Sequence, residues 1–422
     1  MPGNDFDVVV VGGGAAGVAA AKRLQQAAIR CLLVEARPRL GGRAWTVTDS
    51  KGFALDLGCG WLHSGDRNPW AGIAAASSLT IDKSPPPWSK PSLERGFPRA
   101  DQAEFQRAIG AFFARLEAAA QTEPDVAAAN FLDPDCRWNG LINSVGTYIS
   151  GVDLDRLSVK DFDRYEDSGV NWRVVEGYGT LISGYGAALP VMLDCAVTGI
   201  DHGGKRLRVD TARGAIAADQ VIVTVPSAVI AAGGLAFTPA LPRKIDAVRG
   251  LPLGLADKLF MTLDHAEEFD PDVRLFGRTD KKGTGAYQFR PLGRPLIEAY
   301  FGGGLAADLE AGDSRKNCEA AFFDFAVAEL MGLLGNDFAR RIKPNGLHCW
   351  GRDPFALGSY SSALPGFADC RATLAEPVDD RLFFAGEACS AHDFSTAHGG
   401  FLTGVAAAER VIGVRRKSAA KA

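Results

Sequence analysis

The hydrophobic positions at the start of the chain predict a strand, a helix and a second strand in close succession. Asp7 to Val11 contains an uninterrupted β-branched apolar run, which is typical of a central parallel strand covered on both faces. An alanine-rich stretch to about Ala28 predicts the helix, and the apolar run from Cys31 to Val34 predicts the second strand. This order of elements indicates a βαβ unit and therefore a parallel sheet.

The pattern changes repeatedly after this unit. Residues 82–190 contain a proline-rich break and a helical segment, and we expect them to form a partly helical insertion. Residues 191–226 alternate in the manner of strands, with glycine-containing pairs as turns. The expected strands are 197–201, 207–211, 220–225, 258–263, 296–301 and 382–387, the expected helices are 102–121, 315–334 and 399–413, and a frayed basic tail is expected over 415–422.

Composition and charge exclude several classes of protein. With 47% hydrophobic and 23% charged residues, the 422-residue chain has the composition of a globular protein with two or three domains. A formal net charge of −4 argues against a nucleic-acid partner but is compatible with a cationic substrate. The longest apolar run, Val8 to Ala21, is shorter than the roughly 18 residues that a membrane-spanning helix needs, so we expect no membrane partner. Because the first residues also lack the basic segment of a signal peptide, we expect a cytoplasmic protein.

The cysteines predict neither a metal centre nor a disulfide framework. No two of the eight form a CxxC pair, and no histidine lies at metal-ligand spacing from them. We therefore predict no metal site and expect most of the cysteines to be small buried hydrophobic residues. They are Cys31, Cys59, Cys136, Cys195, Cys318, Cys349, Cys370 and Cys389.

A glycine-rich motif follows the first predicted strand directly. Gly12, Gly14 and Gly17 have the spacing GxGxxG, and Glu35 ends the second predicted strand. Gly12 permits a sharp turn, Gly14 lets the backbone approach a pyrophosphate, and Gly17 lets the helix pack closely against the strand. The helix N-terminus offers N–H groups to phosphates, and Glu35 can accept hydrogen bonds from ribose hydroxyls. The arrangement predicts a dinucleotide-binding site.

A second glycine turn distinguishes between the dinucleotides. Gly41, Gly42 and Arg43 follow closely after Glu35, and we expect them to clamp the same pyrophosphate from its other side, which NAD enzymes do not generally need. With distant matching segments added, the chain resembles the FAD-dependent amine oxidase superfamily, which includes the flavin monoamine oxidases and the polyamine oxidases. The resemblance covers nearly the whole chain and is weakest over residues 82–190. The matching segments are 56–61, 197–200, 218–226, 350–360 and 383–387.

This resemblance implies an α/β fold in which a Rossmann-like FAD-binding domain is interleaved with an α+β substrate-binding domain. The implied FAD-binding domain comprises residues 1–81, 191–235 and 377–422, and the implied substrate-binding domain comprises residues 82–190 and 236–376. A noncovalent FAD is implied, because Ser359 stands where mammalian monoamine oxidases carry the cysteine that binds the flavin. The residues implied to contact FAD are Gly12, Gly14, Ala16, Gly17, Glu35, Arg37, Gly42, Arg43, Gly60, Trp61, Val197, Glu387, Thr396 and Ala397.

Two residues match positions on the reacting side of the flavin. Lys258 lies within an apolar predicted strand, where an unpaired ammonium is costly to bury, and it matches the family's lysine that holds a water near flavin N5. The alternative is a lysine at a strand edge that reaches solvent. Tyr360 matches one wall of the family's aromatic cage, and the alternative is a plain core tyrosine. Thr396 stands where monoamine oxidases carry the second cage aromatic, which resembles histone lysine demethylases and leaves Phe394 as a candidate for that wall.

A third candidate, His63, lies in a Trp-Leu-His-Ser stretch that is followed by Asn-Pro and resembles the polyamine oxidases. A neutral imidazole beside the flavin can accept a hydrogen bond from a substrate amine or help it lose a proton. We therefore group His63 with Lys258 and Tyr360 as candidate catalytic residues, the alternative being a histidine satisfied by its neighbours. His392 and His398 are expected to shape the turn before the last helix.

The resemblance implies oxidation of a small-molecule amine. A hydride equivalent passes from the α-carbon of the amine to FAD, the imine is hydrolysed to an aldehyde or ketone plus ammonia or an amine, and oxygen reoxidises the flavin to give hydrogen peroxide. One alternative is an L-amino-acid oxidase, although the Trp-Leu-His stretch offers no arginine for the carboxylate. The other is a flavin-binding scaffold, or a dehydrogenase or desaturase with another acceptor. We expect a monomer or homodimer, and we expect Glu166, Asp167 and Glu176, near the substrate entrance, to lie on a solvated face.

Overall fold

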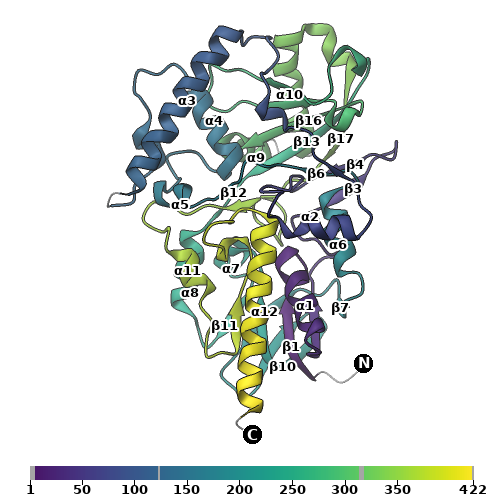
Figure 1. Cartoon of the computed structure of the whole chain (residues 1–422), viewed down its shortest axis with the longest axis vertical. Helices are drawn as coiled ribbons and strands as arrows, with labels where there is room; N and C mark the ends of the chain where they lie inside the picture. The colour runs from purple at the N-terminus through teal and green to yellow at the C-terminus, as the bar shows by residue number, and fades with distance from the viewer. Residues whose placement is uncertain (1–4, 122–123, 313–317, 421–422) are drawn as a thin grey trace.

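A computed structural model describes residues 5–121, 124–312 and 318–420. These residues form two large sheets, one in each half of an elongated molecule (Figure 1). An eight-stranded sheet lies in the half that contains the first strand and the last helix, and a five-stranded sheet lies in the other half. Helices pack around both sheets (Figure 1), and the described residues form three further two-stranded sheets.

The eight-stranded sheet is centred on β1 (Asp5–Val11), the first strand that the sequence predicts. It pairs in parallel with β2 (Cys31–Val34) on one side and with β10 (Gly214–Val223) on the other. The order across the sheet is β11-β8-β9-β10-β1-β2-β7, and β19 pairs in parallel with the end of β10. The other strands are β7 (Val191–Met192), β8 (Val197–Asp201), β9 (Leu207–Thr211), β11 (Ala236–Thr238) and β19 (Leu382–Phe384).

Two helices, α1 (Ala15–Gln26) and α12 (Ala397–Ala419), lie side by side along this sheet (Figure 1). Gly404 permits their close approach, because a Cβ there would lie 2.1 Å from the carbonyl oxygen of Ala16. The expected frayed tail is wrong up to residue 420, since α12 continues to Ala419, and residues 421–422 lie outside the described residues. The physical reason is pairing: Arg415 bonds to Asp7 at 2.8 Å and to Asp219 at 3.3 Å.

The five-stranded sheet is antiparallel, in the order β14-β15-β16-β13-β17. Its two faces have different surroundings. One face, which includes Leu259, Ile297 and Phe301, packs against α9 (Gly303–Ala311) and α10 (Cys318–Leu334). The opposite face carries Lys258 and Glu298, which line a large cavity. The strands are β13 (Ala256–Leu263), β14 (Val273–Phe276), β15 (Ala286–Phe289), β16 (Leu296–Gly302) and β17 (Ile342–Leu347).

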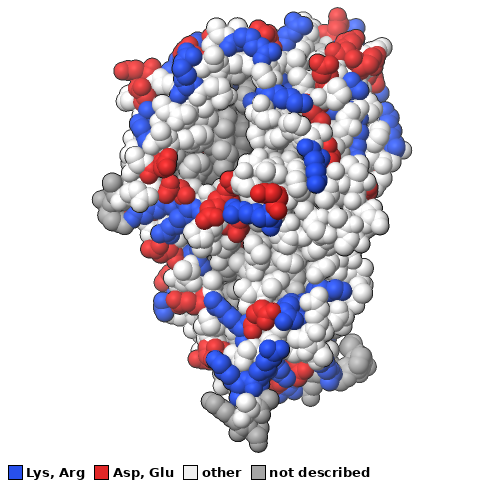
Figure 2. Space-filling view, viewed as in Figure 1, with Lys and Arg blue, Asp and Glu red and all other residues white. Residues whose placement is uncertain are grey.

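A helical layer covers one side of this half of the molecule (Figure 1). It comprises α3 (Arg99–Ala120), α4 (Asn139–Ser150) and α5 (Val159–Asp163), joined by an aromatic core. Figure 2 shows the surface hollowed beside this layer, with mainly uncharged residues inside the hollow. The smaller elements are α2 (Pro69–Ala76), α6 (Tyr178–Gly186), α7 (Ser227–Ala231), α8 (Pro242–Gly250), α11 (Cys370–Ala375), β3 (Thr46–Thr48), β4 (Ala54–Asp56), β5 (Ile81–Asp82), β6 (Arg173–Val174), β12 (Leu253–Gly254) and β18 (Tyr360–Ser361).

The predicted elements are present: β2, β8 and β9 have the predicted ends, and the ends of the others are shifted. The strand predicted over 220–225 is the second half of β10, whose first half pairs with β9, and the strand predicted over 382–387 ends at Phe384. Residues 315–317 of a predicted helix lie outside the described residues. The interleaved domain division stays a prediction, although β11 already lies one residue beyond its predicted boundary at 235. None of the helices that the structure describes is long and apolar enough to span a bilayer.

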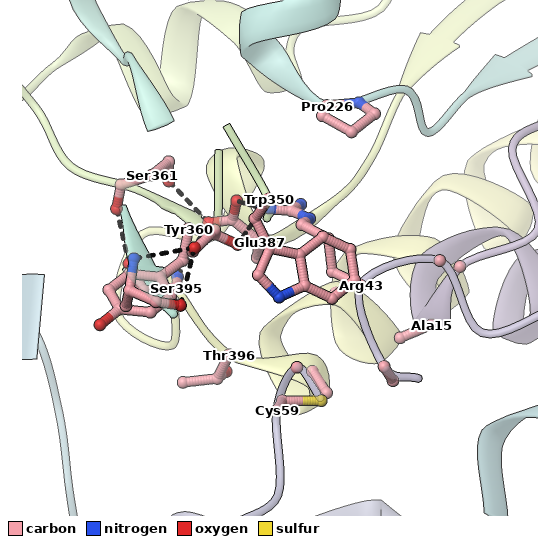
Figure 3. A pocket seen from close by; sticks show the side chains of 18 of the residues that line it. Ala15, Arg43, Cys59, Pro226, Trp350, Tyr360, Ser361, Glu387, Ser395 and Thr396 are labelled. Carbon is pink, nitrogen blue, oxygen red and sulfur yellow. Dashed lines mark hydrogen bonds and ion pairs between the residues drawn. The ribbon is translucent and has the colours of Figure 1, made fainter. Parts of the chain in front are cut away.

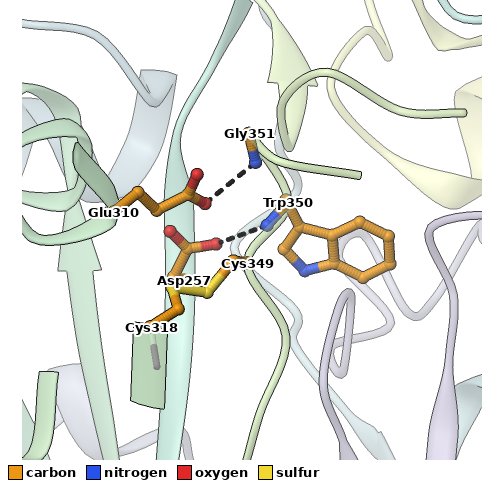
Figure 4. Close-up of a disulfide and its surroundings, with 6 residues drawn as sticks. All are labelled: Asp257, Glu310, Cys318, Cys349, Trp350 and Gly351. Carbon is orange, nitrogen blue, oxygen red and sulfur yellow. Dashed lines mark hydrogen bonds between the residues drawn. A yellow bond between two sulfur atoms is a disulfide. The ribbon is translucent and has the colours of Figure 1, made fainter. Parts of the chain in front are cut away.

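The structure corrects the expectation of free cysteines at two positions. Cys318, at the start of α10, forms a disulfide with Cys349, and their Cα atoms are 6.7 Å apart (Figure 4). The sequence carries no signal for this pair, because only the tertiary fold brings α10 beside the turn after β17. Cys31, Cys195 and Cys389 are buried free thiols, as predicted.

Two buried carboxyl groups lie beside this disulfide and hold the same turn (Figure 4). Asp257 accepts a hydrogen bond from the Trp350 N–H at 3.3 Å, and Glu310 accepts one from the Gly351 N–H at 2.9 Å. Burial and the neighbouring Glu310 raise the pKa of Asp257 well above its usual value. The pair therefore keeps a proton at neutral pH, and it fixes the turn from which the Trp350 ring projects.

Candidate active site

A cavity of about 920 Å³ extends from the glycine turn after β1 to the polar face of the five-stranded sheet. Residues of both sheets and of α4 line it, so it brings together segments that lie far apart in the sequence. Figure 3 shows the part of the lining where Arg43, Trp350, Tyr360 and Glu387 converge.

At one end of the cavity two glycine turns lie against each other, as the sequence predicts. Gly14 forms a parallel bridge with Gly41, and the Gly41 N–H donates to the Gly13 carbonyl at 2.9 Å. Gly17 has no room for a side chain, because a Cβ there would lie 1.8 Å from the carbonyl oxygen of Gly12. The predicted close packing of the helix on the strand is therefore present.

The start of α1 suits a phosphate group. Its N-cap residue, Gly14, makes no side-chain capping hydrogen bond, and Ala15 and Ala16 line the cavity. The first N–H groups of a helix lack intrahelical partners and carry partial positive charge, so they bind anions readily. All the predicted FAD contacts except Gly17 line this cavity, namely Gly12, Gly14, Ala16, Glu35, Arg37, Gly42, Arg43, Gly60, Trp61, Val197, Glu387, Thr396 and Ala397. This lining fits a dinucleotide.

The Glu35 carboxylate is fixed at the end of β2. Its two oxygens accept the N–H of Gly13 at 2.6 Å and the N–H of Arg37 at 2.8 Å. The side chain is buried, yet it lines the cavity. Because each carboxylate oxygen has a further lone pair, Glu35 remains able to accept hydrogen bonds from ribose hydroxyls.

Both predicted arginines at this end are held by carboxylates that the sequence analysis did not pair with them. Arg37 forms an ion pair with Asp353 at 2.7 Å, and Arg43 forms one with Glu387 at 2.9 Å. Burial acts to raise the pKa of Asp353, but His348 and Arg37 outweigh it and hold that pKa far below its usual range. Neither pairing had a sequence signal, since each joins segments more than 300 residues apart.

Glu387 is the centre of a buried hydrogen-bond network (Figure 3). Besides Arg43, it accepts the Ser361 hydroxyl at 2.6 Å and the Ser395 N–H at 2.9 Å. Burial alone would raise the pKa of Glu387, but Arg43 and these partners outweigh it and lower that pKa. Glu387 is therefore ionised and ties the segment after β19 to the second glycine turn.

Lys258 lies on the polar face of β13, with its ammonium turned toward the cavity. Its Nζ is 3.2 Å from Glu298 Oε1, and a Cβ on Gly60 would lie 2.9 Å from that Nζ. Burial alone would lower the pKa of Lys258, but Glu298 and then Asp56 outweigh it and raise that pKa. The solvent-reaching alternative is wrong, because Lys258 is buried and paired beside a predicted flavin contact.

His63 lines the cavity and bonds to Asn171, with 2.6 Å between Nδ1 and Oδ1. Asn171 Nδ2 donates to a carbonyl, which assigns its Oδ1 as the acceptor toward the ring. The imidazole proton therefore resides on Nδ1, and Nε2 is left as an acceptor. Burial lowers the pKa of His63, so the ring is neutral at neutral pH.

Tyr360 is joined to two other tyrosines at the cavity wall. Its hydroxyl donates to the Tyr148 carbonyl at 2.8 Å and accepts from the Tyr300 hydroxyl at 3.0 Å. Tyr300 lies directly opposite Lys258 in the pairing of β13 with β16. The sequence analysis missed Tyr300 and Glu298, although their alternation with buried apolar residues along β16 was a usable signal.

Thr396, at the position of the second cage aromatic, lines the cavity as expected. Aromatic side chains from other positions also line the cavity. Phe394 lines the cavity and packs edge-to-face with Tyr165, with ring centroids 5.5 Å apart. Trp61 packs in the same way against Trp88, which belongs to the insertion, at 4.5 Å. The insertion thus contributes part of the cavity wall, which no sequence motif predicted.

The three acids expected on a solvated face behave differently from one another. Glu166 is exposed and pairs with Arg67 at 3.2 Å, and Glu176 accepts the Thr80 N–H at 2.9 Å. Asp167 is exposed as predicted, but it also lines the cavity, which the prediction missed. Among the described residues no group of three or more metal-binding side chains is arranged to hold a metal ion.

A dinucleotide cradle joined to an aromatic cavity with a buried lysine defines the class of this protein as a dinucleotide-dependent oxidoreductase. The family described as flavin-containing amine oxidoreductase matches residues 120–412, and the NAD(P)-binding Rossmann-like domain matches residues 10–76. The chain belongs to the flavin-containing amine oxidoreductases. Its cofactor is FAD, and it oxidises amines.

Relatives of this family cover almost the whole chain. It is 30% identical to probable polyamine oxidase 4 of Arabidopsis thaliana, over 95% of this chain and 86% of that one. It is 31% identical to polyamine oxidase 3 of Oryza sativa subsp. japonica, over 95% and 88%. The solved structure of wild-type putrescine oxidase bound to putrescine superposes with a TM-score of 0.76 and 18% identity, covering 97% of this chain and 99% of that one. At that identity the superposition supports the fold.

Proposed function

We propose that the substrate is a monoamine, that oxygen accepts the electrons, and that Lys258, His63 and Tyr360 are the catalytic residues. The observation that carries the proposal is the buried Lys258, paired with Glu298 on the cavity wall. Burying such a charged pair on a cavity wall is unfavourable for folding, which favours a role for it in the chemistry.

Each side chain has a role that follows from its surroundings. FAD, when bound, accepts the hydride equivalent from the α-carbon of the amine. Its raised pKa keeps Lys258 protonated, so the ammonium can donate a hydrogen bond to a water in the cavity. His63 can take a proton from the substrate ammonium through Nε2, because the amine must be neutral to react. Tyr360 and Tyr300 exclude water and offer aromatic faces to the amine.

A monoamine suits the carboxylates of the cavity better than a polyamine does. Glu298 is paired with Lys258, and Glu387 with Arg43, so neither is available to a second substrate ammonium. A polyamine carries several ammonium groups, each of which needs a carboxylate or strong desolvation costs follow.

A diamine or polyamine is the second candidate, and Asp167 is the observation that favours it. Its carboxylate lines the cavity and has no ion-pair partner among the described residues. The relatives named polyamine oxidase point the same way. A distal substrate ammonium bound by Asp167 would explain both.

The test is anaerobic reduction of the bound flavin by a panel of amines, which reports the first half-reaction whatever the acceptor. We expect aromatic or long aliphatic monoamines to bleach the flavin faster than putrescine or spermidine. Faster bleaching by the polyamines, reduced at least tenfold by Asp167→Asn, would replace the monoamine with the second candidate. Absence of bleaching by every amine would overturn the proposal. Re-admission of air with peroxide detection tests oxygen as the acceptor.

The remaining predictions concern the state of the protein. We propose that FAD is noncovalent, so denaturation should release it into the supernatant. We propose a monomer or homodimer, which light scattering distinguishes. We also propose a cytoplasmic location, where thiols are normally kept reduced. The disulfide of Cys318 with Cys349 makes that testable: rapid alkylation in cell lysate should label both cysteines in a reducing compartment and neither in an oxidising one.

A further inference from the structure

The polar face of the five-stranded sheet presents a row of side chains that runs away from Lys258. In antiparallel pairing, residues opposite each other point to the same face. The registers place Glu298 opposite Gln288, and Gln288 opposite Arg274. All three line the cavity, as does Lys258. The row therefore crosses the cavity floor from β16 through β15 to β14.

Arg274 is the one member of this row whose charge is unmatched. Glu298 bonds to Lys258, and Gln288 donates to Asp272 at 2.6 Å. The Arg274 guanidinium has no hydrogen-bond acceptor or ion-pair partner among the described residues, and its Nε is fully buried. It lies over the Phe276 ring, 4.5 Å from the centroid.

The surroundings of Arg274 contain no carboxylate that is available to it. Asp272, which accepts the hydrogen bond from Gln288, is already bound by Arg173 at 2.7 Å. Tyr148 is close enough to Arg274 to influence its pKa electrostatically, but its hydroxyl donates to the Thr284 carbonyl. Burial lowers the pKa of Arg274 to about 10, so the side chain remains cationic at neutral pH.

The other two arginines of the cavity wall make the contrast plain. Arg37 is paired with Asp353 and Arg43 with Glu387, each at less than 3 Å. Arg274 is only partly buried, but its Nε is buried without an acceptor and the residue lines the cavity. A largely desolvated guanidinium without an anion is unfavourable, so an unmatched one in a ligand cavity indicates an anionic group on the ligand.

We propose that Arg274 binds a carboxylate of the substrate, at the end remote from the reacting amine. The planar guanidinium matches the two oxygens of a carboxylate, whereas a phosphate would call for further donors, and the neighbouring Gln288 and Tyr148 donate elsewhere. This inference rests on the proposed monoamine oxidation and names its substrate class: an amine that also carries a distant carboxylate.

The position of Arg274 limits how the two groups are spaced. Three strand spacings of about 4.8 Å separate β13 from β14, and Arg274 lies two residues along the strands from the level of Lys258, so the two backbones are roughly 16 Å apart. In an α-amino acid the carboxylate adjoins the reacting carbon, and it does not span this separation. The substrate class is an amino acid whose amine and carboxylate are separated by a long chain or a rigid ring.

The experiment compares ω-amino carboxylates of increasing chain length with alkylamines of the same length, by anaerobic flavin reduction and by kcat/KM. Wild-type protein should prefer one length of amino carboxylate over its matched alkylamine by about tenfold or more. Arg274→Gln should lower kcat/KM for that amino carboxylate by about 100-fold, mainly through KM, because the contact is remote from the chemistry. The same variant should leave kcat/KM for the alkylamine nearly unchanged.

Two further variants keep the result specific. Arg274→Lys keeps the charge but not the two-pronged geometry, and it should restore part of the affinity. Arg278→Gln, which removes an exposed arginine just after the same strand, should leave kcat/KM unchanged for both substrates.

Equal losses for both substrates in Arg274→Gln, or no carboxylate preference at any length in wild-type protein, would overturn the inference. Should the variant lose its flavin, the wild-type comparison of the amino carboxylate with its uncharged methyl ester decides alone, because the ester should lose the preference. Reduction by alkylamines without any carboxylate preference leaves monoamine oxidation standing, whereas no reduction by any amine removes the proposed function itself.

Discussion

The two ends of the cavity differ in how they treat charge. At the FAD end the charged side chains are matched within the protein, as Arg43 is by Glu387. At the amine end, Arg274 and Asp167 have no ion-pair partner among the described residues. One cation and one anion that line the same cavity are thus unmatched within the protein.

This difference teaches which groups each ligand must bring. The FAD end is neutralised by its own residues, so phosphate charge is met by backbone N–H groups at the start of α1. The amine end is left to be completed by the substrate. Changes at the first end should therefore cost cofactor and stability, and changes at the second should alter turnover and selectivity.

The largest effect is expected at the FAD end, from Gly17→Ala. A Cβ would lie 1.8 Å from the Gly12 carbonyl, so α1 must move away from the phosphate site. We expect loss of bound FAD and of all activity, measured as visible absorbance per protein. Gly110→Ala, at an exposed glycine of α3 with open space around it, is the control and should keep full flavin content. Full flavin content in Gly17→Ala would contradict the prediction.

Lys258→Met tests the amine end next. Removing the ammonium from its place between Glu298 and Asp56 should slow oxidation by about 1000-fold while FAD stays bound. Stopped-flow measurement of flavin reduction and reoxidation shows which half-reaction is affected. Lys282→Met, at an exposed lysine, should react normally. A change of less than tenfold in both half-reactions would remove Lys258 from the catalytic residues.

Arg43→Gln returns to the FAD end with a smaller effect and a defined pH dependence. It leaves the Glu387 carboxylate buried without its cation, which should cost about 3–5 kcal/mol of unfolding free energy at pH 8. Arg43 holds the pKa of Glu387 low, and without it burial should raise that pKa. Protonation then relieves the penalty, so the deficit should shrink as the pH falls toward 5.

Denaturant unfolding of holoenzyme at the two pH values measures this. In wild-type protein the pH dependence has the opposite sign. Because the pKa of Glu387 is lowered on folding, this group stabilises the protein above its unfolded pKa, and the stabilisation is lost as the pH falls. Arg43→Gln combined with Glu387→Gln should recover much of the loss. A deficit that is equal at both pH values would contradict the account.

The smallest effect concerns His63. Burial lowers its pKa, while the Asn171 hydrogen bond partly offsets this. In ¹⁵N-histidine NMR spectra we expect a neutral ring with the proton on Nδ1 at pH 6.5, and Asn171→Leu should lower the pKa further. Because the unfolded chain protonates more readily than the buried ring, this group should destabilise the protein as the pH falls below about 6.5. A His63 ring that is charged at pH 6.5 would contradict its assignment as a proton acceptor.

The sequence predicted the FAD end of the cavity better than the amine end. The glycine turns, Glu35 and β1 were predictable because their chemistry is local: each motif needs specific residues at short spacing. The polar face of the five-stranded sheet was not, because strand register is set by pairing between distant segments. Nothing near Arg274 in the sequence indicates that it faces the same cavity as Lys258.

Other misses have equally physical reasons. The partner of Arg37, Asp353, and the disulfide of Cys318 with Cys349 depend on contacts that only the tertiary fold makes. The tail was expected to fray because its basic residues have no local partners, but Arg415 finds Asp7 and Asp219 in the sheet.

That last contact has a practical consequence. β1 begins and α12 ends at the same pole of the molecule, away from the five-stranded sheet (Figure 1). A fusion partner or a surface tether joined at either position would project from that pole and leave the substrate side facing outward. Immobilised enzyme attached through α12 should therefore turn over bulky amines as readily as enzyme in free solution, which makes it a convenient format for screening amine libraries on an oxygen electrode.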